Sequence, residues 1–138
     1  MSLNCKVVMN DFIFPDRIEE QLVELLTYPE VMPNLIGFYG EAGSGKTSFA
    51  KYLAKKIGAN LQYFAMNEGG IDSRWIDANR CWFLGRSVLD DLSKSIQKIT
   101  ILDEFHNLKK DKQDQFKTLF DDVPDTHLVI VCFNSEVG

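Results

Sequence analysis

Residues 35–53 read LIGFYGEAGSGKTSFAKYL, and this stretch decides the fold. It begins with an apolar run, Leu35 to Tyr39, that is too short for a typical helix and leads directly into glycines, which indicates a buried β-strand. Apolar residues then recur at helical spacing and stop at Gly58, which predicts a helix with one apolar face made by Phe49, Leu53 and Ile57. A strand, a glycine-rich turn and a helix therefore follow one another without a break.

The turn itself is a Walker A pattern, with a glycine, four residues, and then Gly-Lys-Thr. Glycines let the backbone curl and point successive N–H groups at a polyphosphate, and the helix N-terminus adds its positive dipole end. Lys46 would then reach the outer phosphates, and the Thr47 hydroxyl would ligate magnesium. A turn that only links strand to helix is the weaker reading. The predicted nucleotide-binding residues are Gly40, Glu41, Ala42, Gly43, Ser44, Gly45, Lys46, Thr47 and Ser48.

A second motif, ITILDEF, covers residues 99–105 and resembles a Walker B pattern, with apolar or β-branched residues leading to Asp103 and Glu104. A buried strand next to the strand of the loop would place Asp103 near the magnesium, through water, and Glu104 where it can orient or deprotonate the attacking water. The alternative is a strand that ends in solvated acids. Two adjacent carboxylates facing a metal and a water are what hydrolysis needs, so we predict hydrolysis rather than binding alone.

The remaining chain alternates in the same way. Further strands are predicted over Leu61–Met66, Ile99–Leu102 and Leu128–Phe133, and helices over Ile18–Leu26, Ser73–Asn79, Val88–Ile96 and around Phe116–Phe120. Apolar strands that alternate with helices favour an α/β fold, a parallel sheet covered by helices on both faces.

Composition fits one globular domain. The chain has 138 residues, of which 45% are hydrophobic and 25% charged, so neither a disordered tail nor a disulfide scaffold is encoded. No apolar run is long enough for a bilayer span, and the N-terminus has no secretory signal, so no membrane partner is expected. Three distant cysteines indicate a reducing compartment, and the cytoplasm is the predicted location. The net charge of -5 does not indicate a protein whose overall charge attracts nucleic acid.

Together the motifs resemble the ATPases of the AAA+ group, and more narrowly the clamp-loader ATPases of replication factor C and T4-type phages, from about Phe12 to Asn134. The resemblance implies a P-loop NTPase fold that uses ATP or ADP with Mg²⁺. It also implies a ring-like oligomer with other ATPase subunits, which acts on a sliding clamp and primed DNA.

Four further residues gain roles only through this resemblance. Asn67, in AMNEGGID, matches the asparagine that restrains the catalytic glutamate until DNA or clamp is bound. Asn134, which follows the strand HLVIVCF, matches the sensor-1 asparagine that helps position the attacking water. Phe12 and Ile13, in FIFP, match the segment that packs around adenine.

The sequence departs from the family pattern at its end. It stops at Gly138, before the fifth strand, the Ser-Arg-Cys arginine-finger motif and the helical lid of a whole clamp-loader subunit. We therefore expect residues 1–138 to be a single, truncated AAA+ core with weak hydrolysis of its own. In the family's strand order the fifth strand pairs with the loop strand, so Leu35–Tyr39 is expected to have an exposed edge.

Three alternatives remain at this point. GEAGSGKT and DEFH also resemble the first two motifs of DExH helicases, and His106 is the extra support for them, although no further helicase motif lies between Ser48 and Thr100. Another AAA+ protein would carry the same two motifs. A nucleotide-binding subunit that does not hydrolyse is the third, against which the intact Lys46, Asp103 and Glu104 argue.

Overall fold

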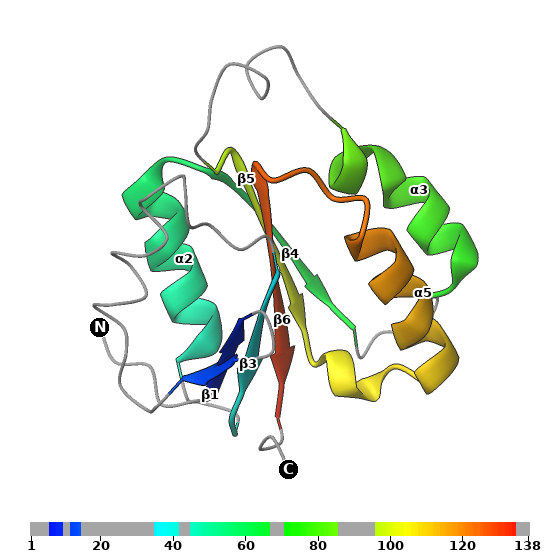
Figure 1. Cartoon of the computed structure of the whole chain (residues 1–138), viewed down its shortest axis with the longest axis horizontal. Coiled ribbons are helices and arrows are strands. Elements are labelled where there is room, and N and C mark those ends of the chain that lie inside the picture. The colour runs from blue at the N-terminus through cyan, green and yellow to red at the C-terminus, as the bar shows by residue number, and fades with distance from the viewer. Residues whose placement is uncertain are drawn as a thin grey trace.

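The computed structural model describes residues 6–9, 12–14, 35–41, 45–66, 71–85 and 96–134. These residues form six strands, three α-helices and one 3-10 helix (Figure 1). In chain order they are β1 (Lys6–Met9), β2 (Phe12–Phe14), β3 (Leu35–Tyr39), α2 (Lys46–Ile57), β4 (Asn60–Ala65), α3 (Ser73–Leu84), β5 (Lys98–Asp103), η2 (Phe105–Asn107), α5 (Lys110–Phe120) and β6 (His127–Phe133).

The strands form one sheet in the order β2-β1-β3-β6-β5-β4. β3, β6, β5 and β4 are parallel, and their register places Tyr39 beside Phe133 and Ala65 beside Asp103. Parallel strands end at the same edge of a sheet, so the carboxyl ends of all four gather at the bottom of Figure 1. The predicted α/β fold with a parallel sheet is confirmed.

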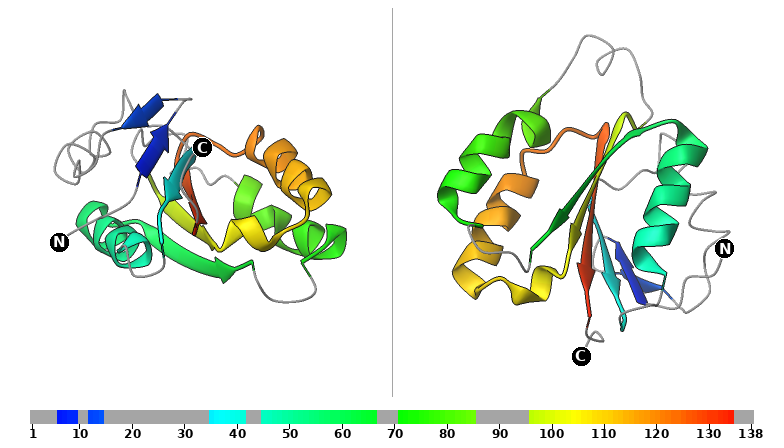
Figure 2. Two further views of the ribbon diagram at one scale, coloured as in Figure 1. Left: turned by 90° about the horizontal axis from the view of Figure 1, so that it is seen from below. Right: turned by 180° about the vertical axis from the view of Figure 1, so that it is seen from behind.

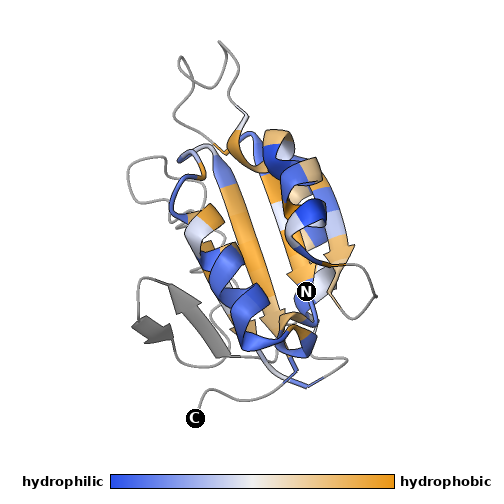
Figure 3. Cartoon of the chain, turned by 90° about the vertical axis from the view of Figure 1, so that its right-hand side faces the viewer, coloured by the Kyte–Doolittle hydropathy of each residue, from blue (hydrophilic) through white to orange (hydrophobic). Residues whose placement is uncertain are grey.

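Helices cover both faces of the sheet, with α2 on one side and α3 and α5 on the other (Figure 2). β6 lies inside the sheet, and its side chains alternate between two apolar clusters, Leu128 and Ile130 on the α2 side, Val129 and Val131 on the other. Burial on both faces explains why this strand reads as an unbroken apolar run. Figure 3 shows the same division by hydropathy, with apolar strands behind helices whose outward faces are largely hydrophilic.

Two helix ends follow from local chemistry. α2 ends at Gly58, whose φ of 73° lies in the left-handed region that a glycine adopts without steric cost. α3 begins after Asp72, whose carboxylate accepts hydrogen bonds from the N–H groups of Arg74 and Trp75. α3 reaches Leu84, beyond the predicted end at Asn79, because its buried face continues to Phe83.

Most predicted elements agree with the structure. The four predicted strands are β3, β4, β5 and β6, with ends shifted by no more than one residue, and the helix around Phe116–Phe120 is the second half of α5. The helices predicted over Ile18–Leu26 and Val88–Ile96 lie outside the described residues, apart from Ile96, which is buried just before β5.

The edge of β3 corrects one expectation. β3 has no exposed edge towards β1, because β1 pairs with it antiparallel, with Val7 beside Phe38, and β2 pairs with β1 in turn. The signal for this hairpin was present in KVVMNDFIF, two short strand-forming runs separated by the turn formers Asn10 and Asp11. The resemblance instead assigns FIFP to adenine contacts, whereas the structure places Phe12–Phe14 in β2.

Candidate active site

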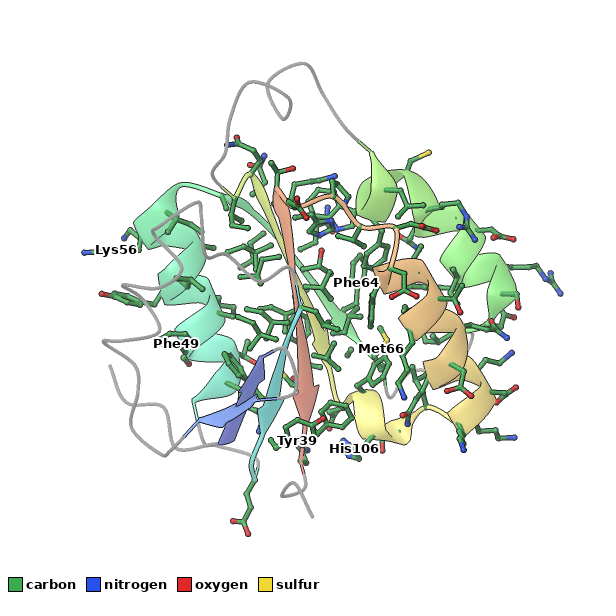
Figure 4. All side chains as sticks on the ribbon, in the orientation of Figure 1. Tyr39, Phe49, Lys56, Phe64, Met66 and His106 are labelled. Carbon is green, nitrogen blue, oxygen red and sulfur yellow. The ribbon has the colours of Figure 1, made fainter. Side chains whose placement is uncertain are left out.

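Five of the predicted site residues lie at the carboxyl ends of three parallel strands. Gly40 and Glu41 come directly after β3, Asp103 ends β5 with Glu104 after it, and Asn134 follows β6. Gly45–Ser48 form the start of α2, which returns from the same edge. Tyr39 and His106 mark this edge in Figure 4. Ala42, Gly43, Ser44 and Asn67 lie outside the described residues.

Two glycines shape the described parts of the loop. Gly40 is buried, and its N–H donates to the carbonyl oxygen of Phe133 over 3.0 Å, so the start of the loop is held by the neighbouring strand. Gly45 has a φ of 90° and directly precedes α2. A residue with a Cβ atom is strained at this angle, which explains the glycine at this step of the pattern.

The first turn of α2 directly follows this loop and carries hydrogen-bond donors. Gly45 provides no side-chain cap, and the first hydrogen bond of the helix ladder runs from the N–H of Phe49 to the carbonyl of Gly45 over 2.9 Å. The first N–H groups of a helix have no partner within it, so this end offers backbone donors and a positive dipole end to an anion. The hydroxyls of Thr47 and Ser48 lie on the same turn.

The Lys46 side chain folds back over the loop. Its ammonium group is buried and donates to the carbonyl oxygens of Gly40 over 2.8 Å and Glu41 over 2.9 Å. A buried ammonium is costly unless hydrogen-bond acceptors surround it, so these carbonyls fix the charge above the loop. The positive charge of Lys46 is thus held beside the residues that directly follow β3.

Asp103 is held at both carboxylate oxygens. Oδ1 accepts from the N–H of Glu104 over 2.9 Å, and Oδ2 accepts from the Tyr63 hydroxyl over 2.7 Å. Tyr63 belongs to β4, the strand beside β5, and sequence analysis missed it. Desolvation, the hydrogen bond to Asp103 and the negative charge of Asp103 together raise the pKa of the Tyr63 phenol well above its usual value, so it stays a donor.

Glu104 has an unusual backbone conformation. Its φ of 55° makes it the one residue other than glycine with a positive φ among those the structure describes. The turn that results carries the chain from β5 into η2, where Phe105 is buried, and leaves the Glu104 side chain half-buried at the strand end. Such a conformation costs about 1 to 3 kcal/mol for a residue with a side chain and is often found at functional sites.

β6 connects the two halves of the site and corrects the predicted strand order. Asp103 does not lie on the strand next to the loop strand, because β6 lies between β3 and β5. Asn134 follows β6 and therefore stands between the loop and the acidic pair, where its N–H donates to His106 Nδ1 over 3.3 Å. Phe12 and Ile13 belong to β2, at the outer edge of the hairpin.

Comparison with known families agrees with this geometry. The family model of the ATPase family associated with various cellular activities (AAA) matches residues 36–136, which include all of β3 but its first residue, α2, the acidic pair and β6. The chain belongs to the AAA family. AAA membership implies ATP-driven activity in general, with a bound nucleotide and usually Mg²⁺, and AAA proteins commonly form rings. A search of curated proteins found no match.

The donor set of this AAA domain fits a magnesium nucleotide. No group of three or more His, Cys, Asp and Glu side chains that could hold a metal occurs among the residues the structure describes. Mg²⁺ usually keeps several waters and is bound by one or two side chains together with phosphate oxygens. The Thr47 hydroxyl and the Asp103 carboxylate would be those side chains. The described helices include none that is long and apolar enough to cross a membrane.

Aromatic rings pack together at the carboxyl ends of β3 and β6. Tyr39 and Phe133 are adjacent in the register of β3 and β6, and their rings stack with centroids 4.4 Å apart. Phe105 meets Phe133 edge to face at 5.6 Å, and burial raises the pKa of the Tyr39 phenol. A Cβ atom at Gly37 would lie 2.8 Å from Cε2 of Tyr39, so the glycine leaves room for this ring. Its place inside LIGFY was the available signal.

Proposed function

We propose that this AAA domain binds ATP with Mg²⁺ and hydrolyses it to drive conformational change in a clamp-loader assembly. Its partners in this proposal are other ATPase subunits in a ring, and through them a sliding clamp and primed DNA. The narrower role rests on the resemblance of its motifs to replication factor C and T4-type phage loaders. We further propose that residues 1–138 form one domain that acts in the cytoplasm.

One observation supports the ATPase chemistry most. The buried Lys46 ammonium, the start of α2 and the acidic pair all belong to the carboxyl edge of the parallel sheet. A polyphosphate at this edge would meet backbone N–H groups and a fixed positive charge, while two carboxylates face it from β5. That combination suits phosphoryl transfer, in which positioning and charge stabilisation supply most of the rate enhancement.

The residues then divide the work. Lys46 binds the outer phosphates, and Thr47 and Asp103 hold Mg²⁺, which neutralises charge that develops on the phosphates. The Glu104 carboxylate orients the attacking water and accepts its proton. Asn134 helps position this water, Asn67 restrains Glu104 until clamp or DNA is bound, and Phe12 and Ile13 contact adenine.

Two measurements test the proposal in turn. Calorimetric titration with ATP in Mg²⁺ should give saturable binding, and phosphate release should follow. Adding partner subunits, a sliding clamp and primed DNA from the same organism should raise the turnover by orders of magnitude. An absence of ATP binding in the folded wild type would exclude the ATPase reading. Binding and turnover that ignore clamp and DNA in the full assembly would exclude only the clamp-loader role.

A further inference from the structure

Tyr63 stands out because it is exposed and yet touches a residue of the site. Its side chain is 44% exposed, the largest exposed fraction among the large apolar residues that the structure describes. It lies on β4, where it pairs with Ile101, two residues before Asp103 on the neighbouring strand. Residues two apart on a strand share a face, so a long side chain at Tyr63 can reach Asp103 diagonally.

The contact completes the hydrogen bonding of one carboxylate. Tyr63 donates to Oδ2 of Asp103 over 2.7 Å, while the N–H of Glu104 donates to Oδ1 over 2.9 Å. Two donors, one on β4 and one in the turn after β5, thus fix the plane of the carboxylate. An ionised carboxylate has about four acceptor positions, so each oxygen keeps room for one more partner.

We propose that Tyr63 is a positioning residue for Asp103, and that its hydroxyl sets the affinity of the site for Mg²⁺ when nucleotide is bound. This inference rests on the proposed function, in which Asp103 holds the ion. A phenol orients the carboxylate and leaves its negative charge in place. An arginine or lysine at the same position would neutralise that charge. Mg²⁺ demands near-octahedral geometry, so the orientation of each ligand affects its binding strongly.

A purely structural role for the hydroxyl is the competing explanation. Tyr63 belongs to neither of the two buried apolar clusters, and the residue is 44% exposed, so without Asp103 its hydroxyl would bond to water. Loss of this one oxygen should therefore change the fold little. Its effect should be confined to the residue that it orients, which allows the two roles to be separated by experiment.

The experiment compares Tyr63→Phe with wild type and with Tyr52→Phe. Tyr52 is a matched control, because it is 39% exposed and lies on the outer part of α2. Affinity for ATP is measured first in EDTA and then as a function of Mg²⁺ concentration, alongside thermal unfolding. Mn²⁺ bound with ATP provides a spectroscopic readout by electron paramagnetic resonance, independent of turnover.

We expect Tyr63→Phe to unfold at the wild-type temperature and to bind ATP equally well in EDTA. It should need about tenfold more Mg²⁺ for half of the metal-dependent gain in ATP affinity, as is usual when a group that orients a metal ligand is lost. The Mn²⁺ spectrum should change in the same variant, and Tyr52→Phe should match the wild type in every measurement.

A double variant tests directly whether Tyr63 acts through Asp103. If Tyr63 acts through Asp103, then Tyr63→Phe should have no further effect on Mg²⁺ dependence in the Asp103→Asn background. An equal Mg²⁺ requirement in Tyr63→Phe and wild type, or the same loss in both backgrounds, would overturn the inference. Failure of the proposed function looks different, because the wild type itself would then not bind ATP.

Discussion

The ammonium group of Lys46 lies 2.8 Å from the carbonyl oxygen of Gly40. Gly40 begins the loop and Lys46 follows it, so this hydrogen bond connects the two ends of the loop. A second hydrogen bond, to Glu41, holds the ammonium group from the same side. The side chain is 6% exposed, so its charge interacts with its surroundings through little water. The charge of Lys46 is therefore fixed beside the first two residues of the loop.

Lys46→Ala should weaken ATP binding. A hydrogen bond to a charged group is worth about 1.5 to 3 kcal/mol, which corresponds to roughly a 10- to 150-fold loss of affinity in titration calorimetry. Lys56→Ala is the matched control, since Lys56 lies on the same helix with an exposed side chain that points away from the sheet (Figure 4). Equal losses in the two variants would show that general charge, rather than the position of Lys46, governs binding.

Glu104→Gln should retain ATP binding and lose turnover. The amide can hold a water molecule but cannot take its proton, and loss of a general base lowers rates by about 10² to 10⁴. Single-turnover phosphate release, measured in the assembly competent for hydrolysis, separates this loss from a loss of binding. Asp121→Asn, at the exposed end of α5, is the control and should hydrolyse as the wild type does. Unchanged turnover in Glu104→Gln would remove Glu104 from the proton-accepting role.

The backbone of Glu104 gives a prediction on stability. At a φ of 55°, Glu104→Gly should be more stable than Glu104→Ala by about 1 to 2 kcal/mol, because glycine has no steric cost in the left-handed region. Chemical denaturation measures both free energies of unfolding. The order should reverse at Lys51, exposed in the middle of α2, where glycine is the worse residue by about 1 kcal/mol. Alanine more stable than glycine at position 104 would contradict the observed turn.

Gly37→Ala should disturb the stacking of Tyr39 on Phe133. The new methyl group would lie 2.8 Å from Cε2 of Tyr39, so the ring must shift from its stacked position, at a cost of about 1 to 3 kcal/mol. Combining Gly37→Ala with Tyr39→Ala should be less harmful than the sum of the two single changes, because the clash is then absent. Additive losses of stability in this double-mutant cycle would mean that Gly37 is not needed to make room for the Tyr39 ring.

The strands and most of the fold could be predicted because burial leaves a clear pattern. Leu128–Cys132 are buried on both faces of the sheet, and β3 buries Ile36 and Phe38, so both strands are apolar runs between glycines, turns or polar residues. α3 was underestimated because Trp75 and Ile76 are followed by polar residues before Phe83 resumes the buried face. Local patterns say nothing about which strand lies beside which, so the place of β6 between β3 and β5 was not predicted.

The sequence predicts those residues of the candidate site that lie close together in short motifs. Lys46, Asp103 and Glu104 stand in motifs with fixed spacing, and the structure brings them to one sheet edge. Tyr63 is forty residues from Asp103 and resembles any exposed strand residue until the register of β4 and β5 is known. Contacts of this kind depend on register, which a single sequence leaves open.

The place of β6 also has a consequence for how the domain is made. β6 is the last described strand to emerge during synthesis, yet it fills the gap between β3 and β5, and neither pairs directly with the other. Until β6 arrives, the β1-β2-β3 half and the β4-β5 half have no shared hydrogen bonds within the sheet. Long-range pairing of this kind slows folding, because the entropy cost of closing a long loop arises before the strand contacts form and stabilise it. A nascent chain that stops before His127 would therefore expose two unpaired inner edges, each a template for association with other chains.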